Sequence, residues 1–195
     1  VCPDSLSFFI PALNNKKGVI AVSTEPRVLI VLGSDSDLPV MAAACSTFDE
    51  FGVPYSLRIL SAHRVPHELA TVATAAKDDN YQVIIAAAGM AAHLPGMIAA
   101  HTTLPVIGVP LQSKVLDGQD ALYSIVQMPP GVPVACVGIN AAKNAALLAL
   151  QILAASDSDL SDALIRYKQT MAETVLNKDK KVQAIGYRAY LQERG

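Results

Sequence analysis

Two residues with complementary chemistry lie side by side in the segment Ser61-Ala62-His63-Arg64-Val65-Pro66. Histidine is the side chain that most readily donates or accepts a proton near neutral pH. Arginine carries a permanent charge on a planar group that matches phosphate or carboxylate. Together, His63 and Arg64 predict a site for an anionic substrate with a proton carrier beside it. The alternative is a surface histidine next to a solvated arginine.

A second polar segment reads Gly33-Ser34-Asp35-Ser36-Asp37 and directly precedes an expected helix. Serine hydroxyls and the free N–H groups of a helix start can hold an anion, and Asp37 could accept hydrogen bonds from ribose hydroxyls. The alternative is that a serine or aspartate here only caps the helix. The segment has neither the Gly-Lys-Ser/Thr ending of a P-loop nor the glycine spacing of a dinucleotide-binding fingerprint.

Two further loops follow expected strands. The segment 89–96 combines small residues with His93, and such a loop can bring backbone N–H groups close to a ligand. His93 by itself is equally consistent with a structural histidine. The segment 110–118, with Lys114 and Asp117, could close over the site.

The sequence gives little support for a metal site, a serine or cysteine nucleophile, nucleic-acid binding or a membrane span. No Cys, His or carboxylate set has convincing metal-ligand spacing, and no G-x-S-x-G hydrolase elbow occurs. Cys45 lies among alanines within an expected helix and is a poor candidate for a nucleophile. The net charge of −2 gives no electrostatic case for nucleic acid, and no apolar run is long enough to cross a membrane. Three cysteines without a disulfide or metal pattern indicate a reducing compartment, and we expect a cytoplasmic protein.

The elements that must position these loops alternate between strand and helix. Short apolar runs predict strands buried on both faces, and each is followed by a break and a helix-forming run. The expected strands are 27–32, 55–60, 82–88, 105–109 and 134–139, and the expected helices are 38–51, 66–77, 94–101, 118–127 and 142–155. Such alternation is typical of an α/β fold with a doubly wound parallel sheet between two helical layers. In such sheets, ligands bind outside the carboxyl ends of the strands, where all four segments lie.

Charge divides the chain into regions. Residues 27–155 carry 9 acidic and 6 basic side chains, whereas the 40 residues 156–195 carry 6 and 7. We therefore expect a catalytic α/β domain at 27–155 and a C-terminal helical tail at 156–195 that packs on the core or on a neighbouring subunit. Residues 1–26 are expected to form a poorly ordered N-terminal extension. Apolar residues make up 52% of the chain, which fits a doubly covered sheet and apolar surface between subunits.

Several motifs, taken in order, resemble the PurE family of N5-carboxyaminoimidazole ribonucleotide mutases of purine synthesis. The resemblance covers about residues 27–155. Its motifs are Gly33-Ser34-Asp35-Ser36-Asp37, Ser61-Ala62-His63-Arg64, Ala91-Ala92-His93-Leu94-Pro95-Gly96-Met97 and Ser124-Ile125-Val126-Gln127-Met128-Pro129.

The resemblance implies a flavodoxin-like three-layer fold, a homo-octamer and no metal, ATP or organic cofactor. The substrate would be N5-carboxyaminoimidazole ribonucleotide and the product 4-carboxyaminoimidazole ribonucleotide. His63 would be the catalytic acid and base, which donates a proton as the carbamate loses carbon dioxide and removes the ring-carbon proton after recarboxylation. The residues that match the family's nucleotide-binding and pocket positions are Ser34, Ser36, Asp37, Ser61, Arg64 and His93.

Two other functions stay open at this point. One is direct carboxylation of aminoimidazole ribonucleotide by carbon dioxide, and the other is a non-catalytic, nucleotide-binding assembly protein on the same fold. Fungal and plant members of the family are fused to an ATP-dependent domain, which implies a functional link to an ATP-dependent carboxyaminoimidazole ribonucleotide synthase. Ala87 and Met90 stand where the family commonly has glycine, and Asn140 belongs to an altered turn; we expect these differences to affect loop geometry and rate.

Overall fold

The computed structural model describes residues 25–193, which form two compact units that divide between Leu153 and Ala154. In the first unit, strands alternate with helices as predicted. Its elements are β1 (Val28–Leu32), a short 3-10 turn (Asp35–Asp37), α1 (Leu38–Phe51), β2 (Tyr55–Ile59), α2 (Pro66–Ala75), β3 (Val83–Gly89), α3 (Leu94–Ala99), β4 (Val106–Leu111), α4 (Gln119–Val126), β5 (Ala135–Cys136) and α5 (Ala142–Ala154).

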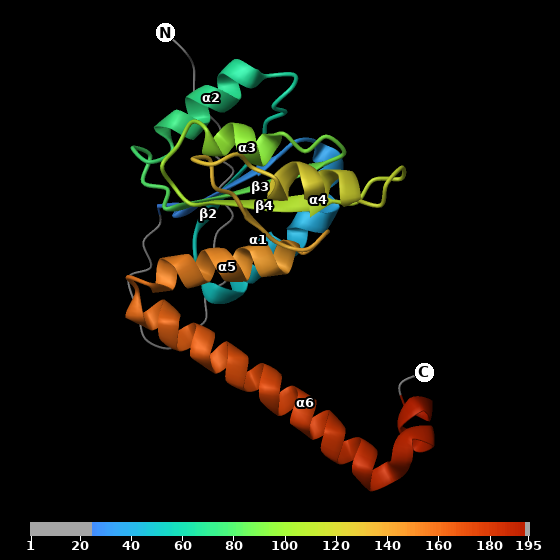
Figure 1. Ribbon diagram of the computed structural model, residues 1–195. Helices are drawn as coiled ribbons and strands as arrows, with labels where there is room; N and C mark the ends of the chain where they lie inside the picture. Colours follow the sequence, from blue (N-terminus) through green and yellow to red (C-terminus); the bar gives the residue numbers. More distant parts are fainter. Residues whose placement is uncertain (1–24, 194–195) are drawn as a thin grey trace. The chain divides into compact units, whose positions relative to one another are not determined.

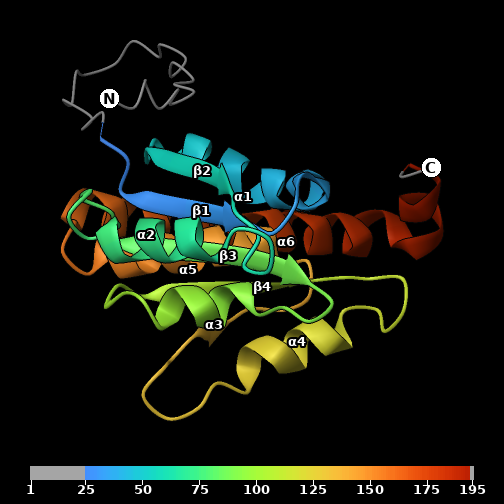
Figure 2. The same ribbon diagram turned by 90° about the horizontal axis from the view of Figure 1, so that it is seen from above.

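The strands form one sheet in the order β2-β1-β3-β4-β5, and every neighbouring pair is parallel. This is the flavodoxin-like order, in which the chain winds outward in both directions from β1 and β3. Helices α2, α3 and α4 cover one face of the sheet, and α1 and α5 cover the other (Figures 1 and 2). The predicted three-layer α/β/α fold is therefore confirmed.

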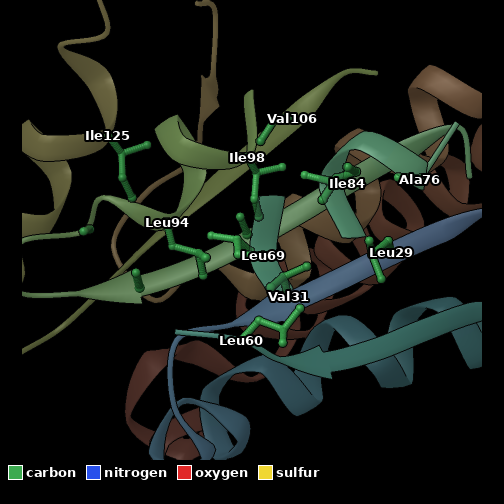
Figure 3. Close-up of a cluster of buried hydrophobic side chains, with 14 of the residues drawn as sticks. Leu29, Val31, Leu60, Leu69, Ala76, Ile84, Leu94, Ile98, Val106 and Ile125 are labelled. Carbon is green, nitrogen blue, oxygen red and sulfur yellow. The ribbon is translucent and has the colours of Figure 1, made fainter. Parts of the chain in front are cut away.

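The central strands are buried on both faces, which explains their continuous apolar sequence. All five residues of β1 are buried, and so are the first six of β3. Because side chains alternate between the faces of a strand, Leu29 and Val31 point toward α2 and α3. There they join a cluster with Leu69, Ile84 and Ile98 (Figure 3).

The last strand is shorter than predicted. We expected residues 134–139, but β5 pairs with β4 only through Ala135 and Cys136. The chain leaves the sheet because it turns at Gly138, whose carbonyl accepts a hydrogen bond from the N–H of Ala141 at 3.0 Å. Asn140 has φ 58° in this turn, a conformation that Asn adopts more readily than most residues.

The second unit contains α6 (Ser158–Gln192), which begins where the Asp157 carboxylate accepts a hydrogen bond from the N–H of Leu160 at 3.1 Å. Gly186, with φ 77° and ψ 156°, interrupts the helix, so the tail consists of two helical stretches. Leu160 and Leu164 are buried, but several other apolar side chains of α6 are exposed. These are Ile165, Met171, Val175, Leu176, Ile185, Tyr187 and Leu191. No helix within residues 25–193 is both long and apolar enough to span a membrane.

Candidate active site

The four segments that the sequence singled out all follow the carboxyl ends of parallel strands, so they meet at one edge of the sheet. Backbone hydrogen bonds hold the strand ends together there. The N–H of Gly33 donates to the carbonyl of Ala87 at 3.2 Å, and the N–H of Leu60 donates to that of Leu32 at 2.8 Å. The loops after β1, β2 and β3 therefore start from a fixed base. This is the position where open α/β sheets bind ligands.

The segment after β1 folds into a tight capped turn. The Ser34 hydroxyl accepts a hydrogen bond from the N–H of Ser36 at 3.3 Å, and the N–H of Ser34 donates to the Asp37 carboxylate at 2.9 Å. The Ser36 hydroxyl also donates to that of Ser34 at 3.0 Å. The capping alternative is thus correct for Ser34. Capping does not exclude binding, because Ser36 is exposed and an anion could replace the bond between the two hydroxyls.

The carboxyl group of Asp37 is partly withdrawn from water. Burial raises the pKa of Asp37 above its ordinary value of 3.8, hydrogen bonds from the N–H groups of Ser34 and Gly33 lower it in part, and the charge of Asp35 raises it further. The net direction is upward. The ionised carboxylate is therefore less favourable in the folded chain than in the unfolded one.

Replacement of Asp37 by Asn should raise the free energy of unfolding at neutral pH. The folded wild-type chain holds the Asp37 proton at pH values where the unfolded chain has lost it. Its stability therefore falls as the pH rises from 3.8 through the raised pKa. Asn carries no charge but keeps an acceptor for Ser34. Urea unfolding should show a gain for Asp37→Asn at pH 7 that disappears below pH 3.8, whereas a loss of stability at pH 7 would contradict this account.

His63 and His93 meet across the site. The distance from His63 Nε2 to His93 Nδ1 is 2.7 Å, and the rings approach edge to face with their centroids 4.9 Å apart. One nitrogen of this contact must donate and the other accept, so at most one of the two rings is cationic in this geometry. The contact fixes the orientation of the His63 ring. It uses Nε2 and does not involve Nδ1. The structure thus brings together the two histidines that the sequence proposed.

Arg64 is presented to solvent at the same edge. Its backbone is set by a turn in which the carbonyl of Ser61 accepts hydrogen bonds from the N–H groups of Arg64 at 3.2 Å and Val65 at 3.0 Å. Proline at the start of α2 then fixes the direction of the following helix. Within residues 25–193, no hydrogen bond or ion pair engages the Arg64 guanidinium, which leaves it available for an anionic ligand.

Strand β3 and the loop after it accommodate Ala87 and Met90, which were noted as departures from the family pattern. Ala87 is completely buried within β3, where its methyl group forms part of the core. Met90 adopts φ 57° with its side chain 61% exposed. That left-handed conformation costs a non-glycine residue about 1–2 kcal/mol. The neighbouring Gly89 packs closely against β4, since a Cβ atom there would lie 3.3 Å from the carbonyl oxygen of Leu111.

A cavity of about 400 Å³ opens between the turn after β1 and the loop between β4 and α4. Ser36 and Asp37 line one side. The other side comes from the loop that was expected to close over the site, including Lys114 and Asp117. His63 and Arg64 are not among the residues that line this cavity, so the candidate site consists of the cavity and an adjoining exposed face. The full lining is Ser36, Asp37, Val40, Leu111, Gln112, Ser113, Lys114, Asp117 and Asn140.

Gln112 is a residue of this site that the sequence reasoning missed. It is the first polar residue after the buried strand β4, and that position at a carboxyl end is a signal that could have identified it. Asn140 was noticed only as a departure from a family pattern.

Residues 25–193 contain no candidate metal site, and Cys45 lacks the features of a reactive thiol. Among the described residues, no group of three or more His, Cys, Asp or Glu side chains is arranged to hold a metal ion. Burial raises the pKa of the Cys45 thiol above its ordinary value, which agrees with the expectation that Cys45 is a poor nucleophile.

Comparison with known proteins gives consistent matches over most of the chain. The family model described as AIR carboxylase matches residues 27–174. The N5-carboxyaminoimidazole ribonucleotide mutase of Synechocystis sp. is 53% identical over 172 residues, which are 88% of this chain and 98% of that protein. The phosphoribosylaminoimidazole carboxylase of Saccharomyces cerevisiae is 52% identical over 170 residues, but these are only 30% of that longer protein. The crystal structure of Treponema denticola PurE matches with a TM-score of 0.74 at 30% identity, over 80% of this chain and 98% of that one.

Proposed function

The chain belongs to the AIR carboxylase family, and we propose that it is an N5-carboxyaminoimidazole ribonucleotide mutase in purine biosynthesis. This is the activity named for the Synechocystis relative, which the chain covers almost completely. The observation that carries the chemistry is the His63–His93 contact of 2.7 Å. Beside it lie a turn rich in hydroxyl groups and Arg64, whose guanidinium is unpaired among residues 25–193. These groups supply what the reaction needs, namely a proton carrier and an anion-binding site.

His63 is the proposed catalytic acid and base. With His93 Nδ1 as the acceptor, a neutral His63 ring carries its proton on Nε2 and presents a lone pair on Nδ1. A protonated His63 then donates its Nδ1 proton to the substrate nitrogen as the carbamate C–N bond breaks and carbon dioxide leaves. The ring carbon attacks the carbon dioxide, and the same Nδ1 takes the proton that this carbon releases. Protons and carboxyl group therefore balance without another reactant.

The remaining site residues hold the nucleotide. Arg64 and the hydroxyl groups of Ser34, Ser36 and Ser61 bind the 5′-phosphate, and Asp37 accepts hydrogen bonds from the ribose. Charge-assisted and bidentate contacts of this kind give both affinity and orientation.

The loop after β3 keeps the released carbon dioxide beside the ring. Its backbone N–H groups can bind the new carboxylate, and its buried residues Ala92 and Leu94 anchor the loop in the core. His93 lies at the start of α3 and also orients His63, so the same loop positions the proton carrier.

Direct carboxylation of aminoimidazole ribonucleotide is the competing enzymatic function. Each nucleotide should be supplied in turn, with and without bicarbonate and without ATP. The mutase converts N5-carboxyaminoimidazole ribonucleotide without added bicarbonate. If the protein converts aminoimidazole ribonucleotide but not N5-carboxyaminoimidazole ribonucleotide, and does so only when bicarbonate is present, it is a carboxylase. Binding of both nucleotides without conversion of either would support the non-catalytic alternative.

We further propose that the chain assembles as a homo-octamer in the cytoplasm and that the tail 156–195 contacts a neighbouring subunit. Exposed apolar residues of α6, such as Met171 at 49% and Val175 at 64%, support this role. An ATP-dependent carboxyaminoimidazole ribonucleotide synthase would supply the substrate. Light scattering should give a mass several times that of the 20.5 kDa chain, and the mass of a single chain would contradict the assembly.

A further inference from the structure

The cavity beside the β1 turn contains a hydroxyl group with no function in the account above. Ser113 lines this cavity together with Ser36 and Asp37. Its Oγ is out of contact with water and has no hydrogen-bond partner among the described residues. A buried hydroxyl without a partner is unfavourable for folding and therefore calls for an explanation.

The backbone around Ser113 is held by a reciprocal pair of amide side chains. The N–H of Gln112 donates to Asn140 Oδ1 at 3.0 Å, and Asn140 Nδ2 donates to Gln112 Oε1 at 3.1 Å. The N–H of Asn140 in turn donates to the carbonyl of Pro110 at 2.9 Å. This Gln112–Asn140 pair ties the loop between β4 and α4 to the turn after β5.

The other end of the same loop is also constrained. Gln112 Nε2 donates to the Asp117 carboxylate at 3.4 Å, and Asp117 and Gly118 both adopt positive φ values, 51° and 87°. A Cβ atom on Gly118 would lie 2.8 Å from Ile139 Cγ2 and 3.1 Å from Gln112 Cα. Glycine reaches positive φ freely, so only Asp117 adopts this conformation at a cost, and such costs accumulate at functional sites.

We propose that Ser113 is a further substrate-binding residue, whose hydroxyl contacts the ribose 5-phosphate part of the nucleotide, and that the Gln112–Asn140 pair positions it. The inference rests on the proposed function, because Ser36 and Asp37 in the same cavity are assigned to the phosphate and ribose. A rotation about one staggered side-chain bond can turn the hydroxyl toward the cavity when a ligand enters. Lys114, on the same wall, adds a positive charge suited to a phosphate.

A purely structural hydroxyl would behave differently under substitution. Folding takes the Ser113 hydroxyl out of water without giving it a hydrogen bond, and this costs free energy. Ser113→Ala removes that cost, so the melting temperature of the ligand-free protein should stay the same or rise. If Ser113 binds substrate, the same substitution should also weaken substrate binding. The KM for N5-carboxyaminoimidazole ribonucleotide should rise about tenfold, as expected for a hydrogen bond to a charged group, with kcat within about twofold.

The positioning role is tested with Asn140→Gly and Asn140→Asp. Glycine retains the positive φ but removes the amide side chain, so Asn140→Gly should raise KM as Ser113→Ala does, and the double variant should show little further increase. Asn140→Asp keeps the acceptor for the Gln112 N–H, but it loses the donor to Gln112 Oε1 and adds a negative charge to the cavity lining, so the affinity for the phosphate-bearing nucleotide should not recover. Ser46→Ala, on the exposed face of α1, is the matched control and should leave KM unchanged.

Thermal shifts with the carboxylated product and with ribose 5-phosphate provide a readout independent of turnover. Both shifts should shrink in Ser113→Ala and persist in Ser46→Ala. If the wild-type protein turns over the mutase substrate and Ser113→Ala has the same KM and the same thermal shifts as the wild type, the inference is overturned. The proposed function then stays intact. Absence of turnover and of any shift in the wild type would instead overturn the proposed function and this inference with it.

Discussion

Replacement of His63 by Asn is expected to lower kcat for N5-carboxyaminoimidazole ribonucleotide by about 10²–10⁴-fold, the usual contribution of an acid–base residue. Asparagine neither donates nor removes a proton under these conditions. Its shorter amide does not reach His93 as Nε2 of His63 does, but the loop around the site should stay in place because Ala92 and Leu94 are buried. Steady-state kinetics should therefore show a large loss in kcat, while calorimetric binding of the product nucleotide stays close to the wild-type value.

The control for this variant is His67→Asn. His67 is exposed on the first turn of α2, only four positions along the chain from His63, and lies outside the candidate site. Its replacement should leave kcat unchanged. A His63→Asn variant that retains substantial activity would exclude proton transfer by His63, whatever its other roles in the pocket.

Replacement of Arg64 by Ala is expected to raise KM for the nucleotide by about 10- to 100-fold, because a charge-assisted contact to phosphate is worth roughly 1.5–3 kcal/mol. Arg64→Lys should restore only part of this affinity, since an ammonium group cannot form the planar bidentate contact. The fold should be unaffected, as the exposed guanidinium has no partner among residues 25–193. KM at several salt concentrations measures the effect, and its salt dependence should weaken in Arg64→Ala.

Arg58→Ala supplies a control with the same change in charge. Arg58 lies in β2, and its guanidinium is 3.4 Å from the Glu68 carboxylate with both side chains about half exposed. Loss of such a surface ion pair costs about 0–1 kcal/mol of stability and should not alter KM. Equal changes in KM for Arg58→Ala and Arg64→Ala would show that general charge, not a specific phosphate contact, determines affinity.

The fold could be predicted from the sequence wherever burial alone determines the local structure. β1 and β3 are central strands, so their residues are apolar throughout, and the expected limits were right to within one residue at each end. β5 lies at the edge of the sheet, where the apolar run 134–139 does not indicate how many residues pair. A turn at Gly138, held by backbone contacts, ends the strand after Cys136.

The candidate site could be predicted in its parts but not in its contacts. His63, Arg64 and Asp37 could be identified as candidate site residues from their side-chain chemistry and from their positions after predicted strands. The bond from His63 to His93 joins residues 30 positions apart, and those between Gln112 and Asn140 join residues 28 apart. Pairings over such distances depend on how the strand ends are arranged in the folded sheet, and no local pattern specifies them.

The central claim is that one active site moves a carboxyl group from the substrate nitrogen to the ring carbon without losing it. The most direct test is to supply N5-carboxyaminoimidazole ribonucleotide labelled with ¹³C in its carbamate, in buffer with unlabelled bicarbonate and no ATP. Mass spectrometry of the 4-carboxy product should find the label retained, because carbon dioxide stays beside the ring between the two steps. A product that contains mainly unlabelled carbon would show that carbon dioxide comes from solution and would contradict the proposed mutase.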